Sequence, residues 1–590
     1  MNVLIPLLGG LVLMLWAGRL YSARVARWLG VDDSRKTPAY VFEDGKDYVP
    51  SRVHVVFAHH FSVIAGAGPI VGPVLALTYG WLPALSWIVI GCVLFGAMHD
   101  MTAMFVSMRE EGRSMAELSR RTLGNAGYFL FLAFLIVILT LINAIFLNLS
   151  CKALTAAYPV ALLKLAPTEH ILTTFVNARG VMMGRIGGIA TTSVLVITLA
   201  APIIGWWVHK RQAPTLALYA LAVVICAVSV WAGFLWPIQL DEATWRYVMA
   251  GYIFCACWLP VWLVLQPRDF INAQILYAGV VVMFLGVIAL GLRGTALQTP
   301  ALALAEGARV AGPIWPFLMI TVACGAISGF HSLAASGTTV KQITRESDVR
   351  RVGYNAMLME GVLALLALLL ASAALPRAEY FSIVFPASND GNPILAFAVA
   401  MGYLLHDLTG LKVAFGSVLG ILVLEGFVVT TLDTAVRLCR YMMEEFWLVA
   451  FPRVPAPVMQ VLRHPLFNTL LAVGLMLFFA GNSTIMSAWK IFGAGNQLIA
   501  ALAMVVATVW LLQRGRSFWF ALVPACIMSV TTFVTLILAI RQNVAPAGSG
   551  QLLLPGKWPL TIAALLLLTL AVGILLVSVR RIRDERDFRF

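Results

Sequence analysis

Charged residues are scarce in this sequence. Only 12% of its 590 residues carry a charge, against roughly 25% in an ordinary soluble domain. Apolar residues make up 61%, and the mean hydropathy is +0.90. Because so few charges cannot cover so much apolar surface in water, the composition excludes a soluble enzyme, a nucleic-acid-binding protein and a secreted disulfide scaffold. It predicts an integral protein of the lipid bilayer.

Motifs for metals and nucleotides are also absent. The eight cysteines include no Cys-x-x-Cys pair, and no Gly-x-x-x-x-Gly-Lys-Ser/Thr stretch occurs. No set of nucleophile, base and orienting residue is apparent. We therefore expect no cofactor, no resident metal and no enzymatic activity. Six cysteines lie in apolar runs, where this residue packs as a small hydrophobe: Cys92, Cys226, Cys255, Cys257, Cys324 and Cys526.

Long apolar runs dominate the chain. A membrane-spanning helix needs about 20 mostly apolar residues. About fifteen runs are interpreted as spans: 2–18, 54–80, 83–108, 126–150, 187–208, 215–236, 247–265, 275–292, 314–338, 354–375, 412–436, 466–481, 485–512, 517–540 and 559–579. A further run, 393–405, is too short to span and lies between polar loops. We expect it to form a helix at the membrane surface.

The basic residues are distributed unevenly between the predicted loops, which explains the net charge of +14. Lys and Arg favour the cytoplasmic side of a membrane. If the N-terminus is outside and the spans alternate, 29 of the 41 Lys and Arg residues fall on the inside, with Arg268 in a cytoplasmic loop. The excess of Lys and Arg on the inner side persists along the chain only if 393–405 does not span the membrane. The sequence thus predicts an outside N-terminus and a cytoplasmic C-terminus.

Helix-breaking residues interrupt the run 54–80. Gly66, Gly68, Pro69, Gly72 and Pro73 fall in its middle, shortly after two adjacent histidines. Proline removes an amide donor, and glycine lowers the cost of unwinding. We expect two half-helices whose N-terminal amides attract anions and whose freed carbonyls attract cations. The alternative is a simple proline kink at a packed helix crossing.

Small polar residues interrupt a second run, 314–338. They include Ser328, Gly329, His331 and Ser332. The alternative is close helix packing, which small residues also allow. By the predicted topology, the two interrupted spans run in opposite directions. Such a pair is the signature of inverted-repeat transporters, with the binding site between the two breaks.

A third candidate lies near the end of the run 412–436. Thr430, Asp433, Thr434 and Arg437 share one face of a predicted helix. The hydroxyls and the carboxylate could hold a coupling cation or a proton. Alternatively, Asp433 and Arg437 form an i,i+4 ion pair.

Several single residues are weaker candidates. Asp100 follows His99, which fits a proton relay or an interior pair. Glu360 and Lys490 lie inside apolar runs and either neutralise each other or have separate partners. Asn496 and Gln497 are candidate gate or packing residues near the start of another span.

The histidines need separate consideration. His59 and His60 are neighbours, so they project about 100° apart on a helix and cannot both face one cavity. At most one of them touches a ligand, and the other is free to bond a neighbouring helix. A zinc site formed by these two residues and His331 has no supporting sequence spacing.

Together these segments resemble the carbon starvation protein A family of bacterial inner-membrane transporters. The resemblance rests on residues 58–61, 65–73, 266–269, 323–332, 336–339, 430–434 and 495–497, in that order. They cover most of 50–510. The family is associated with uptake of peptides and of pyruvate. The resemblance implies an all-α membrane protein of the bacterial inner membrane, with a LeuT-like inverted repeat and two discontinuous helices.

The resemblance also organises the chain. It implies that 54–80 and 314–338 are the two broken core helices, that 393–405 is an external-loop helix, and that 412–436 is the eighth core helix. Two extra spans, 247–265 and 275–292, leave open whether the repeat is five-plus-five or seven-plus-seven. One polytopic transporter domain, 1–590, then consists of an N-terminal extra helix and loop (1–53), the core (54–512) and C-terminal accessory helices with a basic tail (513–590).

The predicted function is secondary active uptake of a small carboxylate-bearing nutrient, a peptide or pyruvate, by alternating access. The predicted substrate site comprises His59, His60, Gly66, Ala67, Gly68, Pro69, Ser328, Gly329, His331 and Ser332. The driving cation is expected to be a proton in preference to sodium, carried by Asp100, Thr430, Thr431, Asp433 and Thr434. The resemblance adds Thr431 to Thr430 and Thr434, and implies an ion site that these threonines form with the backbone near 64–66. A nutrient receptor without transport and a channel are the alternatives.

Overall fold

The computed structural model describes residues 1–587, apart from 46–47, 166–168, 170, 178, 212–213, 260–262, 388–390, 484, 545–553 and 555. In these residues the chain is almost entirely helical. Eleven helices are long and apolar enough to cross a membrane. They are α1 (Leu4–Leu29), α5 to α6 (Trp81–Gly91 and Ala97–Arg109, joined by the π-helical η2, Cys92–Gly96), α7 (Met115–Leu154), α8 (Gly187–Arg211), α9 (Thr215–Leu235), α11 (Leu265–Leu292), α16 (Asn355–Ala374, preceded by η4, Arg350–Tyr354), α19 (Val413–Ala450), α22 (Ile485–Gln513), α23 (Trp519–Asn543) and α24 (Trp558–Asp587).

Two further spans are bent pairs of helices. The first joins α3 (Val53–Ile64) to α4 (Gly68–Ala76) and η1 (Leu77–Tyr79) with a bend of 51°. The second joins α20 (Ala456–Leu462) to α21 (Pro465–Gly481) with a bend of 47°. The described residues therefore contain up to 13 spans in place of the fifteen expected from the sequence. The break between Ile64 and Gly68 is where the glycine and proline pattern predicts it.

Two predicted spans account for the difference. For 247–265, the structure has α10 (Glu242–Trp258), whose 17 residues are short for a bilayer. Part of the predicted span, 260–262, lies outside the described residues. For 314–338, the structure has three short helices: α13 (Ile314–Thr321), α14 (Ala323–Ala326) and α15 (Phe330–Gly337), followed by η3 (Thr339–Gln342). The small polar residues interrupt this run more often than an ordinary span allows.

The short run 393–405 forms α18 (Pro393–Thr409). Its 17 residues are apolar but fewer than a span requires. The Asn392 side chain caps it by accepting a hydrogen bond from the Leu395 amide (3.0 Å). Most of α18 is buried, and it packs along α19 and α16. Three other short helices are α2 (Pro38–Val41), α12 (Leu304–Ala311) and α17 (Arg377–Val384).

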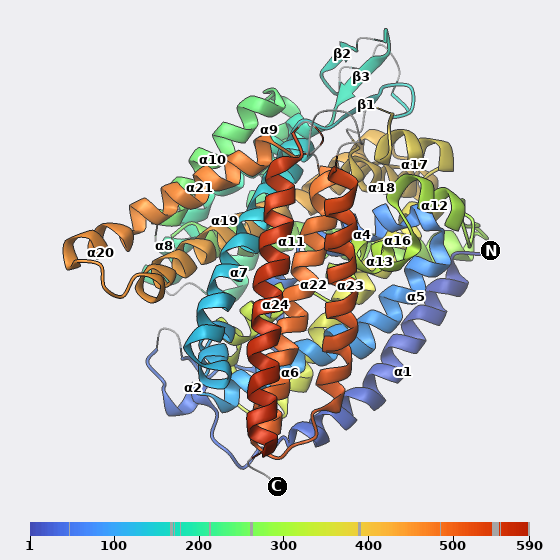
Figure 1. Ribbon diagram of the computed structural model, residues 1–590. Coiled ribbons are helices and arrows are strands. Elements are labelled where there is room, and N and C mark those ends of the chain that lie inside the picture. Colours follow the sequence, from blue (N-terminus) through green and yellow to red (C-terminus); the bar gives the residue numbers. More distant parts are fainter. Residues whose placement is uncertain are drawn as a thin grey trace.

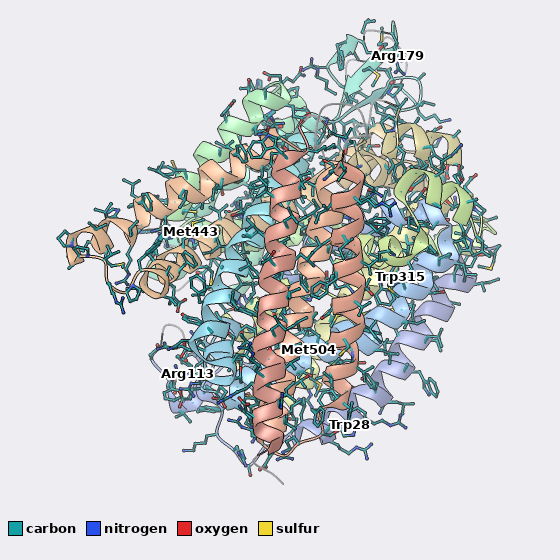
Figure 2. All side chains as sticks on the ribbon, in the orientation of Figure 1. Trp28, Arg113, Arg179, Trp315, Met443 and Met504 are labelled. Carbon is teal, nitrogen blue, oxygen red and sulfur yellow. The ribbon has the colours of Figure 1, made fainter. Side chains whose placement is uncertain are left out.

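A small antiparallel sheet follows α7, where the sequence predicted only a loop. It consists of β1 (Ala157–Pro159), β2 (Thr174–Val176) and β3 (Met182–Arg185), in the order β1-β3-β2. The sheet and the C-terminal end of α24 lie at opposite ends of the molecule (Figure 1). Arg179, in this sheet region, and Arg113, before α7, likewise lie at opposite ends (Figure 2). The alternation of spans places these two arginines on opposite membrane sides.

The centre of the bundle is formed by α4, α16 and α22. The apolar part of α22 is buried along its whole length, and that of α16 nearly so. In contrast, no more than a third of the apolar windows of α1, α9 and α24 is buried, and the rest is exposed or half-exposed. An exposed apolar surface of this kind suits contact with lipid. The interrupted segments α4, α14 and α15 pack against the buried helices, so the breaks lie inside the protein.

Candidate functional site

The two interrupted segments approach each other closely at two glycines of α4. A Cβ atom added to Gly68 would lie 2.3 Å from Cβ of Cys324, which is closer than any side chain tolerates. At Gly72, the added Cβ would lie 2.6 Å from the carbonyl oxygen of Thr321. Glycine is therefore required for α4 to approach α13 and α14 this closely. The crossing brings together the two breaks that the sequence predicted to flank a site.

A small cavity lies beside this crossing. It has a volume of about 30 Å³, room for about two water molecules. Residues from both breaks line it, together with residues of α16, α19 and α22: Gly66, Gly68, Pro69, Cys324, Ser328, Glu360, Thr431 and Asn496. Aromatic side chains Phe146, Phe330 and Phe492 complete its wall. A bound nutrient would require the surrounding helices to move apart.

The predicted substrate residues divide between this cavity and its surroundings. Gly66, Gly68, Pro69 and Ser328 line it, and Ala67 is the buried residue that precedes α4. Pro69 has no amide hydrogen, the Gly66 amide donates to the Ile64 carbonyl (2.8 Å), and the next two amides of α4 donate to the Ala67 carbonyl, so among the described residues of this break the amides without a backbone acceptor are those of Ala67 and Gly68. These are the positions where the sequence analysis placed a substrate carboxylate.

The second break differs from the prediction. The Gly329 amide donates to the carbonyl oxygen of Asn496 (3.1 Å), and the Phe330 amide donates to Asn496 Oδ1 (3.1 Å). The Ser332 hydroxyl donates to the Gly329 carbonyl (2.7 Å). The expectation that these amides are free for a substrate carboxylate is therefore wrong in this conformation. Asn496 acts as a cap for α15.

A buried cluster of ionisable residues adjoins the cavity. Nδ1 of His331 lies 2.8 Å from Oδ2 of Asp100, and its Nε2 lies 3.1 Å from Oε2 of Glu360. Nδ1 of His99 lies 2.7 Å from Oδ1 of Asp100. All four side chains are at most 1% exposed. Through Glu360, the cluster forms part of the cavity wall.

His331 lies between two carboxyl groups. Its Nδ1 is hydrogen-bonded to Asp100, whereas its Nε2 lies within ion-pair distance of Glu360 without forming a hydrogen bond, because neither Glu360 oxygen has a hydrogen-bond partner among the described residues. A histidine ring is neutral or carries a second proton, and the doubly protonated ring would place a positive charge between the two carboxylates. This arrangement can take up and release a proton.

His59 and His60 are not bonded to that cluster. His60 is buried, its Nδ1 lies 2.9 Å from the Thr339 hydroxyl, and it lies within electrostatic range of Asp100 and His331. His59 is exposed and lies within electrostatic range of Asp269. In the described part of the chain, the three histidines considered for zinc do not form a group that could hold a metal ion. Neither His59 nor His60 lines the cavity.

A second charged cluster joins α11 to α19. Arg268 lies 2.6 Å from Asp433 and 2.8 Å from Asp269, and it donates to the Tyr252 hydroxyl. Thr430 donates to Asp269 (2.8 Å). Arg268 is fully buried, so its prediction as a cytoplasmic loop residue is wrong. The reason is that α11 begins at Leu265, ten residues before the predicted span, and carries the arginine into the bundle.

The predicted coupling residues do not form one site. Asp433 pairs with Arg268, whereas Arg437 donates to the carbonyls of Ala256 (2.6 Å) and Leu259 (3.1 Å). The alternative of an Asp433–Arg437 pair is therefore wrong. Thr434 lies 3.5 Å from Asp433. Of the predicted coupling residues, Thr431 is the one that lines the cavity. Its hydroxyl lies close to Gly66, since a Cβ atom added to that glycine would be 3.3 Å from the hydroxyl oxygen.

Glu360 and Arg268 are the residues whose position the sequence analysis missed. Glu360 and Lys490 do not pair, because Lys490 donates to Gln542 (3.3 Å) and Glu360 contacts His331. A single carboxyl inside an apolar run was the available signal for Glu360. For Arg268, the polar sequence at 266–269 marked the segment but did not indicate burial.

Two interrupted segments that meet at a buried cavity, beside ionisable residues inside the bundle, are typical of transporters. The fold and the site define a multi-pass membrane transport protein. Comparison with known proteins gives its family. The family model described as carbon starvation protein CstA matches residues 2–392 and 386–535, and the chain belongs to this family.

Individual relatives match along most of the chain. The peptide transporter CstA of Bacillus subtilis is 31% identical and covers 98% of this chain and 97% of its own length. The peptide transporter CstA of Campylobacter jejuni is 32% identical, over 90% of this chain and 79% of the relative. The pyruvate/proton symporter BtsT of Escherichia coli is 30% identical, over 88% and 78%. These relatives are transporters, which agrees with the prediction that the chain is not an enzyme.

A solved structure also aligns with the chain. It is a manganese transporter of Eremococcus coleocola, with 12% identity and a TM-score of 0.35, covering 90% of this chain and 96% of that structure. A similarity this low carries no argument about the fold. The LeuT-like repeat therefore stays a prediction.

Proposed function

We propose that the chain takes up a small carboxylate-bearing nutrient across the bacterial inner membrane, driven by the proton gradient. The candidate substrates are pyruvate and short peptides, the classes named for its relatives. The observation that carries the proposal is the position of Glu360, which lines the cavity and contacts the buried His331. The orientation follows the charge distribution, with a periplasmic N-terminus and a cytoplasmic C-terminus.

The substrate carboxylate binds at the amides of Ala67 and Gly68, which have no backbone acceptor among the described residues and lie at the start of α4, where a helix N-terminus favours negative charge. Thr431 adds a hydroxyl from the opposite wall. The Asn496 amide nitrogen, which contacts Ser328 (3.1 Å), completes the polar lining. The cavity is small, so pyruvate fits with less displacement of the helices than a peptide does.

Coupling follows from the charge of Glu360. A carboxylate substrate and an ionised Glu360 repel each other in this low-dielectric cavity. Proton uptake by the cluster of Asp100, His331 and Glu360 removes that repulsion, so substrate and proton bind together. Loss of the proton on the cytoplasmic side restores it and favours release. The core helices rock against the remaining helices to alternate access, as in transporters with inverted repeats.

The same residues favour a proton over sodium. Of the predicted cation ligands, Asp433 already has the Arg268 guanidinium as its partner, and Thr430 bonds Asp269. Thr431 alone contributes to the cavity. Thr431 with the backbone near 64–66 supplies only part of the predicted cation site, whereas the histidine between two carboxylates can hold a proton.

The test is uptake of labelled pyruvate and of labelled dialanine into proteoliposomes that contain the purified protein. A proton gradient and a sodium gradient are imposed separately. We expect uphill accumulation of one of the two substrates with the proton gradient only. Accumulation driven only by sodium would refute the coupling, and specific binding without accumulation of either substrate would indicate a receptor.

A further inference from the structure

A second, larger chamber lies on the side of the bundle where α4 ends. It has a volume of about 520 Å³. Leu75 near the end of α4 and Thr321 of α13 form part of its wall, together with the starts of α22 and α24 and the end of α23. The chamber therefore adjoins the two interrupted segments. By the predicted topology, this is the outer side of the membrane.

The chamber is lined by positive charge. Arg309, Lys490 and Lys557 line it, and none of its described lining residues is Asp or Glu. Among the described residues, none of these three cations has a carboxylate within 4.0 Å. Lys490 donates to Gln542 (3.3 Å), and its ammonium lies 4.6 Å from the centre of the Phe317 ring. Both are neutral partners.

The two lysines repel each other across the chamber. A concave surface with several like charges focuses the electrostatic field and concentrates counter-ions. An organic anion between Lys490 and Lys557 would relieve their repulsion. The amide side chains of Gln542 and Asn543 offer further hydrogen bonds to such an anion.

Two adjacent aromatic rings of α22 border this chamber and the cavity beside Gly68. Trp489 lines the chamber, and Phe492 lines the cavity. Their ring centres are 5.0 Å apart, and Phe492 also meets Phe146 edge-on at 6.0 Å. The indole of Trp489 donates to the Thr321 carbonyl (3.2 Å), which ties this barrier to the interrupted span.

We propose that the chamber is an outer binding site for the carboxylate of the transported nutrient, with Lys490 and Lys557 as its contacts. Trp489 and Phe492 form the closed barrier between this outer site and the inner cavity. This inference rests on the proposed function, because it assumes that the chain transports an organic carboxylate. It adds a site to which no predicted substrate residue contributes.

The test measures the apparent KM for external pyruvate and dialanine in proteoliposomes of neutral phosphatidylcholine. The variants are Lys490→Gln, Lys557→Gln and their combination, each checked for a monodisperse elution profile. We expect each single change to raise KM by about fivefold, with the maximal rate within about twofold of wild type, because a local field changes capture rather than turnover. The control is Arg179→Gln, which removes one positive charge from the exposed sheet region (Figure 2).

A KM of the double variant equal to that of Arg179→Gln would overturn the outer site while leaving the proposed function intact. If the wild-type protein transports neither substrate, the proposed function fails. The outer site is then tested by itself, by equilibrium binding of labelled pyruvate to the protein in phosphatidylcholine nanodiscs. The outer site is supported if the lysine substitutions abolish pyruvate binding and Arg179→Gln preserves it. Unchanged binding, or competition by inorganic phosphate as strong as by unlabelled pyruvate, overturns the assignment to a carboxylate.

Discussion

The guanidinium of Arg268 lies 2.6 Å from the carboxylate of Asp433, and neither side chain is more than 1% exposed. This ion pair joins α11 to α19 inside the bundle. Removing two charges from water is costly, so each of them depends on the other. The pair therefore holds α11 against α19, the helix that carries Thr431.

Breaking this pair on one side should destabilise the protein. Asp433→Asn leaves Arg268 with only the partly exposed Asp269 as a charged partner, and we expect a loss of about 3 kcal/mol. The double change Arg268→Gln with Asp433→Asn should recover most of that loss, because no unpaired charge stays buried. Thermal unfolding of the purified protein in detergent measures both. Arg35→Gln, in an exposed pair, is the control and should change stability by less than about 1 kcal/mol.

Glu360→Gln should uncouple uptake from the proton gradient. Glutamine has nearly the same shape but cannot titrate, so the cavity stays intact while the proton shared with His331 is lost. We expect uphill accumulation to fall by about tenfold and exchange of labelled for unlabelled substrate to continue. The matched control is Glu425→Gln, which alters another fully buried carboxyl group that bonds Ser150 and does not line the cavity. Full proton-driven accumulation by Glu360→Gln would contradict the proposed role.

His331→Ala should reduce uptake more than it reduces folding. The change leaves Asp100 with His99 as its bonding partner but removes the ring that lies within ion-pair distance of Glu360. Uptake is compared with the amount of monodisperse protein in the membrane. His60→Ala serves as the comparison, since His60 bonds Thr339 outside the cavity. Wild-type uptake by correctly inserted His331→Ala would refute the assignment.

The crossing at Gly68 can be tested by exchanging two residues. Gly68→Ala places a methyl group 2.3 Å from Cβ of Cys324, so we expect the two interrupted segments to separate and uptake to be lost. Adding Cys324→Gly removes both crowding atoms, and the nearest remaining atom of that residue is Cα at 3.8 Å. Uptake should return in the double variant. If Gly68→Ala alone transports at the wild-type rate, the close approach is not needed for function.

The two adjacent threonines should differ in their effect on substrate affinity. Thr431→Val removes a hydroxyl from the cavity wall, and we expect the KM to rise by about fivefold, the effect of one lost hydrogen bond. Thr430→Val removes the bond to Asp269 outside the cavity and should leave the KM within about twofold of wild type. The measurement is initial uptake as a function of substrate concentration. A larger rise for Thr430→Val would place the substrate at the Arg268 cluster.

The sequence by itself determined the class of protein and the position of the first break. Low charge and long apolar runs leave only a membrane protein, because lipid is the only solvent that such a surface tolerates. Glycine and proline act locally on the backbone, so the break before Gly68 could be predicted from their positions alone. The family motifs were also readable, since they are stretches of consecutive residues.

Tertiary structure decided the partners of the charged residues. His331, Asp100 and Glu360 lie on three different helices and meet only when α15, α6 and α16 pack together. Arg268 appeared to belong to a loop because the apolar run begins after it, yet packing against α19 extends α11 over it and buries it beside Asp433. Local sequence patterns indicate where the backbone of a segment is helical or broken and whether the segment lies in lipid or in water. The pairing of charges far apart in the sequence depends on which helix faces meet, and that is determined by packing of the whole bundle.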